Sequence, residues 1–162
     1  MPGADIEKLN EAIEQASGLF NRLVLLVAES GSGKTTLLNE ICEQRTGSFI
    51  NVNLQLSQKL LELPRSKRPA KVDRLFGELI ESCSGDLIVL DDLEVLFDPA
   101  LKVDTLRLLK GHSRNTTLIA SWNGTFHDGT LSYAEPDHPE YKSYRDVDVP
   151  VVSVTKQTTA SY

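Results

Sequence analysis

The segment from residue 23 to residue 36 constrains the fold of this chain most strongly. An apolar run over residues 23–28 predicts a buried strand, and the apolar spacing after residue 36 predicts a helix. Between them lies the motif Ala28-Glu29-Ser30-Gly31-Ser32-Gly33-Lys34-Thr35. A strand, a tight glycine turn and a helix N-terminus in this order are the structural context of a phosphate-binding P-loop.

The residue types of this motif suit a nucleoside triphosphate. Backbone N–H groups reach phosphate oxygens only where no Cβ blocks close approach, as at Gly31 and Gly33. Lys34 would contact the β- and γ-phosphates, and the Thr35 hydroxyl would bind Mg²⁺. Ala28 replaces the glycine of the strict pattern, and an ordinary glycine turn with a solvated lysine is the alternative. We predict that ATP or another nucleoside triphosphate, with Mg²⁺, binds Glu29, Ser30, Gly31, Ser32, Gly33, Lys34, Thr35 and Thr36.

Length and composition bound the organisation of the chain. Its 162 residues suffice for one domain with a sizeable core, which we assign to residues 1–154. The polar residues 155–162 are expected to be a disordered tail. A net charge of −6 gives no general attraction to nucleic acid or to a membrane. Because there is no basic N-terminus, no long apolar run and only two distant cysteines, we expect a cytoplasmic protein with buried, reduced thiols.

Strand and helix patterns alternate along the chain. This alternation predicts an α/β fold, specifically the three-layer P-loop NTPase fold, with a central, mainly parallel sheet of five strands covered by helices on both faces. The predicted strands cover residues 23–28, 48–53, 86–92, 116–121 and 147–154, and the predicted helices residues 6–16, 34–46, 57–63, 72–83 and 99–111. Polar residues at the carboxyl ends of the strands would then converge on one site.

Two carboxylates end the third predicted strand. Asp91 takes the Walker B position and would hold Mg²⁺ with Thr35, directly or through water. Asp92 would orient or deprotonate the attacking water, although aspartate is one methylene shorter than the glutamate that many hydrolases use, so slow turnover is expected. Glu94 is a less suitable substitute because it lies beyond the strand end. The alternative for both aspartates is helix capping.

The order of the P-loop motif, Asp91-Asp92, Asn123 and Arg145 resembles the core of an AAA+ ATPase over nearly the whole chain. The resemblance implies that Asn123, after the fourth strand, senses the γ-phosphate; a turn asparagine is the alternative. It also implies that Arg145, before the fifth strand, is an arginine finger acting on a neighbouring molecule. Arg114 is the other candidate, and a surface arginine is the alternative. The helical lid that normally follows this core has no counterpart in the sequence.

The chain more closely resembles the BrxF family of small P-loop proteins from type 3 BREX bacteriophage-exclusion systems. The resemblance extends to the stretches Asn53-Leu-Gln-Leu-Ser57 and Leu131-Ser-Tyr-Ala-Glu-Pro-Asp-His-Pro-Glu-Tyr141. It implies a cytoplasmic bacterial ATPase that forms homo-oligomers and works with other BREX proteins, including a DNA methyltransferase, to block phage DNA.

Two further segments carry weaker signals. The basic cluster at residues 65–71 would contact DNA or an acidic partner through Arg65, Lys67, Arg68 and Lys71, and a solvated loop is the alternative. Residues 124–145 are rich in turn formers, and we expect the aromatic side chains in and beside them to pack on the sheet rather than stack on bases, namely Trp122, Phe126, Tyr133, Tyr141 and Tyr144.

Three functions fit these residues. The first is an Mg²⁺-dependent nucleoside triphosphatase whose nucleotide state changes its assembly. The second is a non-hydrolysing, nucleotide-gated scaffold, favoured by the short Asp92 side chain. The third, a small-molecule kinase, ranks last because no arginine-rich lid is evident beyond the basic cluster.

Overall fold

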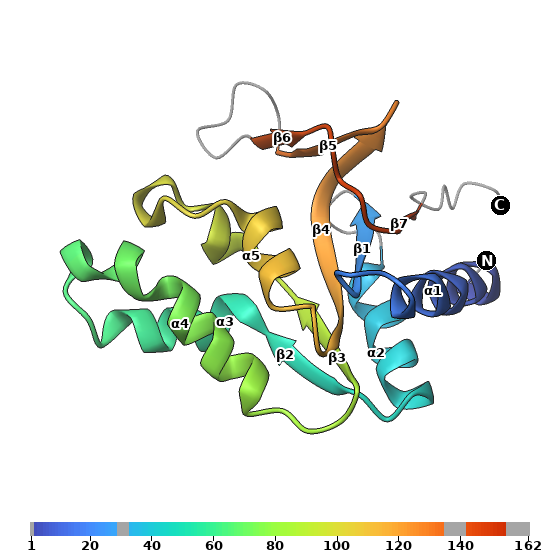
Figure 1. Cartoon of the computed structure of the whole chain (residues 1–162), viewed down its shortest axis with the longest axis horizontal. Coiled ribbons are helices and arrows are strands. Elements are labelled where there is room, and N and C mark those ends of the chain that lie inside the picture. The colour runs from blue at the N-terminus through green and yellow to red at the C-terminus, as the bar shows by residue number, and fades with distance from the viewer. Residues whose placement is uncertain (1, 29–32, 135–141, 155–162) are drawn as a thin grey trace, which may run out of the picture.

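The computed structural model describes residues 2–28, 33–134 and 142–154, with side chains from residue 5 onward (Figure 1). The helices are α1 (Pro2–Ser17), α2 (Lys34–Gln44), α3 (Val52–Leu61), α4 (Arg68–Glu81) and α5 (Thr105–Gly111). The strands are β1 (Leu23–Ala28), β2 (Ser48–Asn51), β3 (Leu87–Asp91), β4 (Thr117–His127), β5 (Thr130–Tyr133), β6 (Lys142–Tyr144) and β7 (Val151–Ser153). Short 3-10 helices are η1 (Arg65–Lys67), η2 (Glu94–Phe97) and η3 (Pro99–Leu101).

The sheet has the strand order β2-β3-β4-β1-β7, and each neighbouring pair in this series is parallel. The five-stranded parallel sheet expected from the sequence is therefore confirmed. Parallel neighbours require crossover connections, and the helices between the strands supply them. As a result, β1, β3 and β4 end at the same edge of the sheet.

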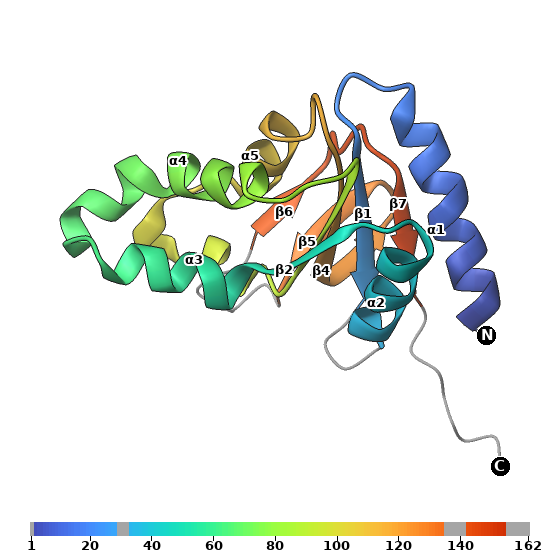
Figure 2. The ribbon, with the colours of Figure 1, turned by 90° about the horizontal axis from the view of Figure 1, so that it is seen from below.

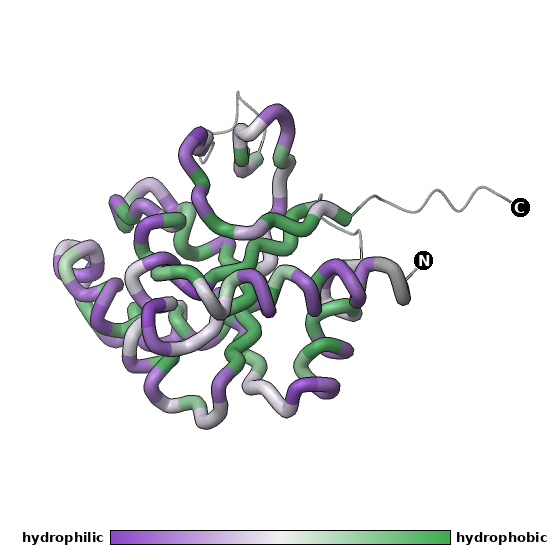
Figure 3. The backbone as a smooth tube through the Cα atoms, turned by 45° about the vertical axis from the view of Figure 1, so that its right-hand side comes forward, coloured by the Kyte–Doolittle hydropathy of each residue, from purple (hydrophilic) through white to green (hydrophobic). Residues whose placement is uncertain are grey.

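The residues of β1 alternate between two hydrophobic cores. Leu23, Leu25 and Val27 belong to the core with α3, α4 and α5, whereas Val24 and Leu26 belong to the core with α1 and α2. Figure 2 shows the same division, with α1 and α2 on one side of the strands and the other helices opposite. Hydrophobic residues follow the central strands, and hydrophilic residues concentrate outside them (Figure 3). A strand buried on both faces explains why residues 23–28 are continuously apolar.

The helix after β2 begins earlier than expected. The second strand ends at Asn51 rather than residue 53, and α3 starts at Val52 rather than residue 57. The Asn51 side chain accepts a hydrogen bond from the Leu54 N–H at 2.9 Å, so Asn51 and not Ser57 is the N-cap. Val52 and Leu56 lie four residues apart and are both fully buried, which fixes the helix against the sheet.

The helix expected at residues 99–111 is divided. η3 ends before Lys102, which adopts a left-handed conformation with φ of 54°, and α5 starts only after Asp104. The Asp104 side chain caps α5 by accepting the Arg107 N–H at 3.1 Å. The expected last strand is also shorter: Asp148 has a φ of 57° and Pro150 lacks an N–H, so regular pairing is confined to β7.

Residues 124–134 and 142–145 form more regular structure than the sequence suggests. β4 continues to His127 and forms antiparallel pairs with β5, which in turn pairs with β6. The Tyr133 ring stacks on Phe97 at 3.5 Å, and Trp122 and Tyr144 lie edge to face at 5.8 Å. The aromatic residues therefore pack as expected, except that Phe126 is 36% exposed and Tyr141 lies outside the described residues.

Three other expectations concern single features. Cys42 and Cys83 are free, as expected, but half-buried rather than buried. Across the described ranges, no helix combines the length and apolar character needed to cross a membrane. The expected disordered tail, residues 155–162, lies outside the described residues.

Candidate nucleotide-binding site

A cavity of about 640 Å³ opens at the carboxyl ends of β1, β3 and β4, beside the N-terminus of α2. Ligands of parallel α/β sheets bind at this edge. The cavity brings together most of the site residues expected from the sequence that fall within the described ranges. Its lining residues are Gly33, Lys34, Thr35, Thr36, Asn51, Asp91, Asp92, Glu94, Ser121 and Asn123.

Gly33 ends the glycine turn and caps α2. Its φ of 85° is in the left-handed region, which glycine adopts without the strain that a Cβ causes. α2 begins immediately afterwards, so its N-terminal turn and the positive end of its dipole lie beside the cavity. Glu29, Ser30, Gly31 and Ser32 lie outside the described residues, and their phosphate contacts stay a prediction.

Lys34 is almost enclosed, with 7% of its surface exposed. Its Nζ donates a hydrogen bond to the Ala28 carbonyl at 3.1 Å, which directs the side chain back along the end of β1. Burial lowers the pKa of Lys34 from its ordinary value, and the negative charge of Asp91 partly offsets this effect. A buried ammonium gains most from an anionic ligand, so its position favours phosphate binding.

Thr35 and Asp91 lie in contact across the cavity. The Thr35 hydroxyl donates to Asp91 Oδ2 at 2.8 Å. Mg²⁺ prefers oxygen ligands in an octahedron at 2.0–2.1 Å, which places neighbouring ligand oxygens about 2.9 Å apart. The two oxygens therefore fit adjacent positions around one Mg²⁺, as ligands or through bound water.

Ser121 is a site residue that the sequence reasoning missed. Its hydroxyl donates to Asp91 Oδ1 at 2.9 Å, and the Asp92 N–H donates to the same oxygen at 3.0 Å. Asp91 therefore accepts hydrogen bonds on both oxygens, which fixes its orientation. Ser121 is brought to Asp91 by the pairing of β3 with β4, where Leu90 lies opposite Ala120. The sequence alone does not reveal this pairing.

Asp92 has an unusual backbone for a non-glycine residue, with φ of 56°. Its carbonyl accepts the Asn53 N–H at 2.8 Å, and its own N–H lies 3.2 Å from Ser121 Oγ. These contacts hold the left-handed turn that directs the chain from β3 into η2. Because the carboxylate lines the cavity, it is available to a water molecule or ligand there.

Asn51 and Glu94 also line the cavity, although the sequence reasoning gave Asn51 no role and ranked Glu94 low. Asn51 combines this position with capping α3. Glu94 is exposed at the start of η2. Asn51 had no signal in the sequence, because the predicted strand continued to residue 53 whereas β2 ends at Asn51.

Asn123 lies on β4 opposite Ala28, the last residue of β1, and is half-buried. It was expected after the fourth strand but lies within β4, where it lines the cavity, and its role as a sensor of the γ-phosphate stays a prediction. Arg145 is exposed, follows β6 and is not a lining residue. Arg114 lies over the Phe20 ring at 4.6 Å, also away from this cavity. Neither arginine contributes to the cavity within one chain.

The strand order, the glycine-capped helix and the carboxylate at the end of β3 define the AAA+-like form of the three-layer P-loop NTPase fold. The expected fold class is therefore confirmed, and across the described residues no helix follows β7.

The comparison with known proteins agrees with this fold. The sequence matches no family model and no curated protein. The structure is similar to the replication initiator DnaA bound to AMPPCP and single-stranded DNA, with a TM-score of 0.52 and 19% identity over 93% of this chain. It is also similar to a DNA replication initiation factor, with a TM-score of 0.50 and 19% identity over 91% of this chain. The chain spans 45% and 44% of these proteins, and the likeness is one of fold.

Proposed function

We propose that this chain binds and hydrolyses ATP, or another nucleoside triphosphate, together with Mg²⁺. The observation that carries the proposal is the Thr35–Asp91 contact of 2.8 Å beside the buried Lys34 at the N-terminus of α2. One cavity thus offers a cation for phosphate, two oxygens for a metal ion and the positive end of a helix dipole.

In this proposal each residue of the site has a separate role. Lys34 binds the β- and γ-phosphates, and the residues of the glycine turn contribute backbone N–H groups. Thr35 and Asp91 hold Mg²⁺, with Ser121 keeping Asp91 oriented. When bound, the metal ion neutralises charge that develops on the phosphates. Asp92 orients the attacking water and takes up its proton, and Asn123 contacts the γ-phosphate from β4.

The arginine that usually completes such a site is supplied by a neighbour in this proposal. Arg145 is exposed and lies outside the cavity of its own chain, as a residue acting on another molecule must. Hydrolysis would then depend on self-assembly or on a partner. The resemblance to the BrxF family suggests that the partners are other BREX proteins and that the process is defence against phage DNA.

DNA contact would use the basic cluster. Arg65, Lys67 and Lys71 are exposed around η1 and the start of α4, while Arg68 is half-buried and donates to the Leu63 carbonyl. The similar DnaA structure is bound to single-stranded DNA, which is a property of that protein.

A non-hydrolysing scaffold is the second candidate. The specific observation in its favour is that neither Arg114 nor Arg145 lines the cavity, while the base, Asp92, has a short side chain. In this form, bound nucleotide would order the site and an interface without turnover.

The test is phosphate release measured across protein concentration with ATP and Mg²⁺, beside the mass from light scattering. If specific activity rises as larger species form, and Lys34→Ala and Arg145→Ala abolish it, the ATPase proposal stands. Arg74→Ala is the matched control, because Arg74 is exposed and pairs with Glu78 at 3.4 Å, remote from the cavity lining. Wild-type activity equal to that of Lys34→Ala, with intact nucleotide binding, would favour the scaffold.

A further inference from the structure

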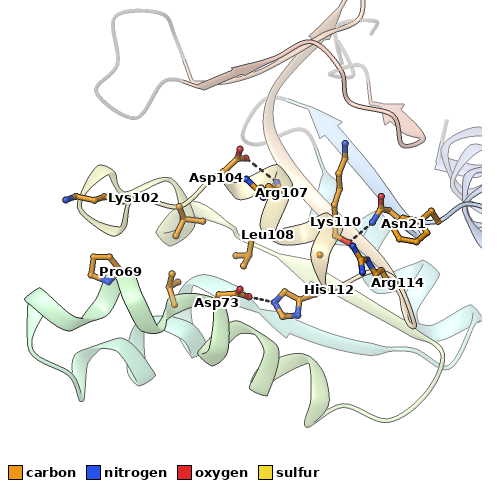
Figure 4. Close-up of a pocket in the computed structure, with 14 residues that line it drawn as sticks. Asn21, Pro69, Asp73, Lys102, Asp104, Arg107, Leu108, Lys110, His112 and Arg114 are labelled. Carbon is orange, nitrogen blue, oxygen red and sulfur yellow. Dashed lines mark hydrogen bonds and ion pairs between the residues drawn. The ribbon is translucent and has the colours of Figure 1, made fainter.

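A second cavity, of about 590 Å³, lies between α4 and α5 and shares no lining residue with the nucleotide site (Figure 4). Apolar residues form part of its wall, among them Val72 from α4 and Leu108 from α5. Figure 4 shows Lys102 at one end and Arg114 with Asn21 at the other, so the cavity is an elongated groove. We call it the α4–α5 groove.

The groove carries four cations against two carboxylates, in a chain whose net charge is −6. Its cations are Lys102, Arg107, Lys110 and Arg114. Within the described residues, none of the four forms an ion pair with a carboxylate, although Lys110 Nζ donates to the Asp146 carbonyl at 3.5 Å. Unpaired like charges repel one another, so this concentration is unfavourable unless an anion binds there.

Both carboxylates of the groove are already engaged. Asp73 pairs with His112 at 2.6 Å. Asp104 caps α5 through the Arg107 N–H and also contacts Tyr144, whose pKa is raised to about 12, first by burial and then by the Asp104 charge. The two carboxylates are therefore held by His112 and by the N-terminus of α5 rather than by the side chains of the four cations.

An exposed aromatic ring lies at the Arg114 end. Phe20, in the connection between α1 and β1, is 70% exposed although the Arg114 guanidinium lies over its ring at 4.6 Å. A phenylalanine this exposed leaves apolar surface in water. A flat apolar ligand could stack on it beside the guanidinium.

We propose that the α4–α5 groove binds single-stranded nucleic acid, with phosphates on the four cations and a base on Phe20. Positive grooves with accessible aromatic rings are the usual means of holding a single strand. A duplex keeps its bases stacked inside, so it would reach the cations but not Phe20 or the apolar wall. An acidic peptide has no flat ring to stack and uses only the charges.

The spread of the cations sets the length of the ligand. α5 has 7 residues and is therefore about 10 Å long at 1.5 Å per residue. Lys102 precedes α5 and Arg114 follows it, so their charges lie farther apart than a single phosphate reaches. The basic cluster at residues 65–71 includes Pro69, which lines the Lys102 end, and would extend the path of the strand.

The test is fluorescence anisotropy with labelled oligo(dT) and oligo(rU) of about 15 nucleotides, a size suited to such grooves. A duplex of equal length, a glutamate-rich peptide and dTMP are the comparison ligands. Saturating ATP and Mg²⁺ occupy the nucleotide site, and the Lys34→Ala protein is measured in parallel. Binding of either oligonucleotide would support the proposal, and the difference between their affinities would show whether the groove prefers DNA or RNA.

We expect single strands to bind more tightly than the duplex, with a slope of log K against log salt of about −3, from four contacts at −0.7 each. Lys102→Ala and Arg107→Ala should each weaken binding and reduce the slope by about 0.7. Phe20→Ala should weaken binding about five-fold or more without changing the slope. Lys34→Ala should bind as wild type, since Lys34 lies in the other cavity.

Matched control variants distinguish binding in the groove from nonspecific binding to exposed charged or apolar side chains elsewhere on the surface. Lys59→Ala removes an exposed lysine that pairs with Glu78 at 3.8 Å, and Phe126→Ala removes an exposed ring on β4; neither should matter. Phosphate release should be unchanged in Lys102→Ala, Arg107→Ala and Phe20→Ala. The proposal would be overturned if the duplex bound as tightly as the single strands or more tightly, if only the peptide bound, or if no ligand bound. It would also be overturned if dTMP competed as strongly as oligo(dT), or if the groove variants bound single strands as wild type does.

Discussion

Ser121 donates a hydrogen bond to Asp91 Oδ1 at 2.9 Å from the neighbouring strand, while Thr35 donates to the other oxygen of the same carboxylate at 2.8 Å. The carboxylate that we propose as a Mg²⁺ ligand is thus held from β4 on one side and α2 on the other. A residue of β4 therefore supports a site whose sequence motifs lie in other segments. In metal sites such supporting partners orient the ligand and tune its affinity.

Ser121→Ala should weaken Mg²⁺-dependent nucleotide affinity about five-fold, the effect of one lost hydrogen bond of about 1 kcal/mol. Affinity without Mg²⁺ should change little, because Lys34 is untouched. Titration with a fluorescent ATP analogue, with and without Mg²⁺, measures both. Ser113→Ala is the control, since Ser113 is fully buried but donates to the Lys110 carbonyl instead. Equal Mg²⁺ dependence in the two variants would contradict this role.

Lys34 should make stability depend on pH. Burial lowers its pKa in the folded chain below the ordinary value of 10.5, so the unfolded chain binds more protons between those two values. The free energy of unfolding contributed by Lys34 therefore rises as pH increases through this window. Urea denaturation without nucleotide, at neutral pH and near pH 10, should show wild type gaining stability relative to Lys34→Met. A constant difference between the two proteins would refute the burial effect.

Variants of Asp92 should distinguish the role of its charge in phosphate release from the role of its backbone conformation in stability. Asparagine tolerates a left-handed backbone, so Asp92→Asn should unfold within about 0.5 kcal/mol of wild type while losing phosphate release. Asp92→Ala should lose phosphate release too and cost about 1 kcal/mol in stability. Asp148, exposed with φ of 57°, provides the control: Asp148→Ala should cost stability alone. Full activity in Asp92→Asn would remove Asp92 from the mechanism.

Gly124 should be required for the hairpin of β4 and β5. A Cβ at this position would overlap the Ser132 carbonyl, so Gly124→Ala should lower stability by about 2 kcal/mol or more. A Cβ at Gly111 meets nothing within 4 Å, and Gly111→Ala should be neutral or slightly stabilising. Urea denaturation followed by the fluorescence of Trp122, the only tryptophan, measures both. Equal stability of the two variants would mean that the hairpin adjusts freely.

Sequence-based boundaries were reliable where one local pattern dominates. The apolar run of β1 predicted its bounds because both faces of that strand are buried. Boundaries were wrong where two signals compete within a few residues. Ser57 and Asn51 are both good N-cap residues, and only the packing of Val52 and Leu56 against the sheet selects Asn51. The hairpin was missed although its turn has a local signal: His127 pairs with Thr130 across the two-residue turn Asp128-Gly129, whose φ values are 50° and 77°.

The sequence by itself determined the parallel α/β sheet, the glycine-capped helix and the carboxylate at the end of β3, because periodicity and short motifs are properties of neighbouring residues. The tertiary structure decided what depends on strand order and helix packing. It placed Ser121 beside Asp91, excluded Arg114 and Arg145 from the cavity of their own chain, and set the cations of residues 102–114 beside Phe20 and α4 in the α4–α5 groove. These contacts join residues far apart in the chain, so only the folded backbone brings their side chains within interaction distance.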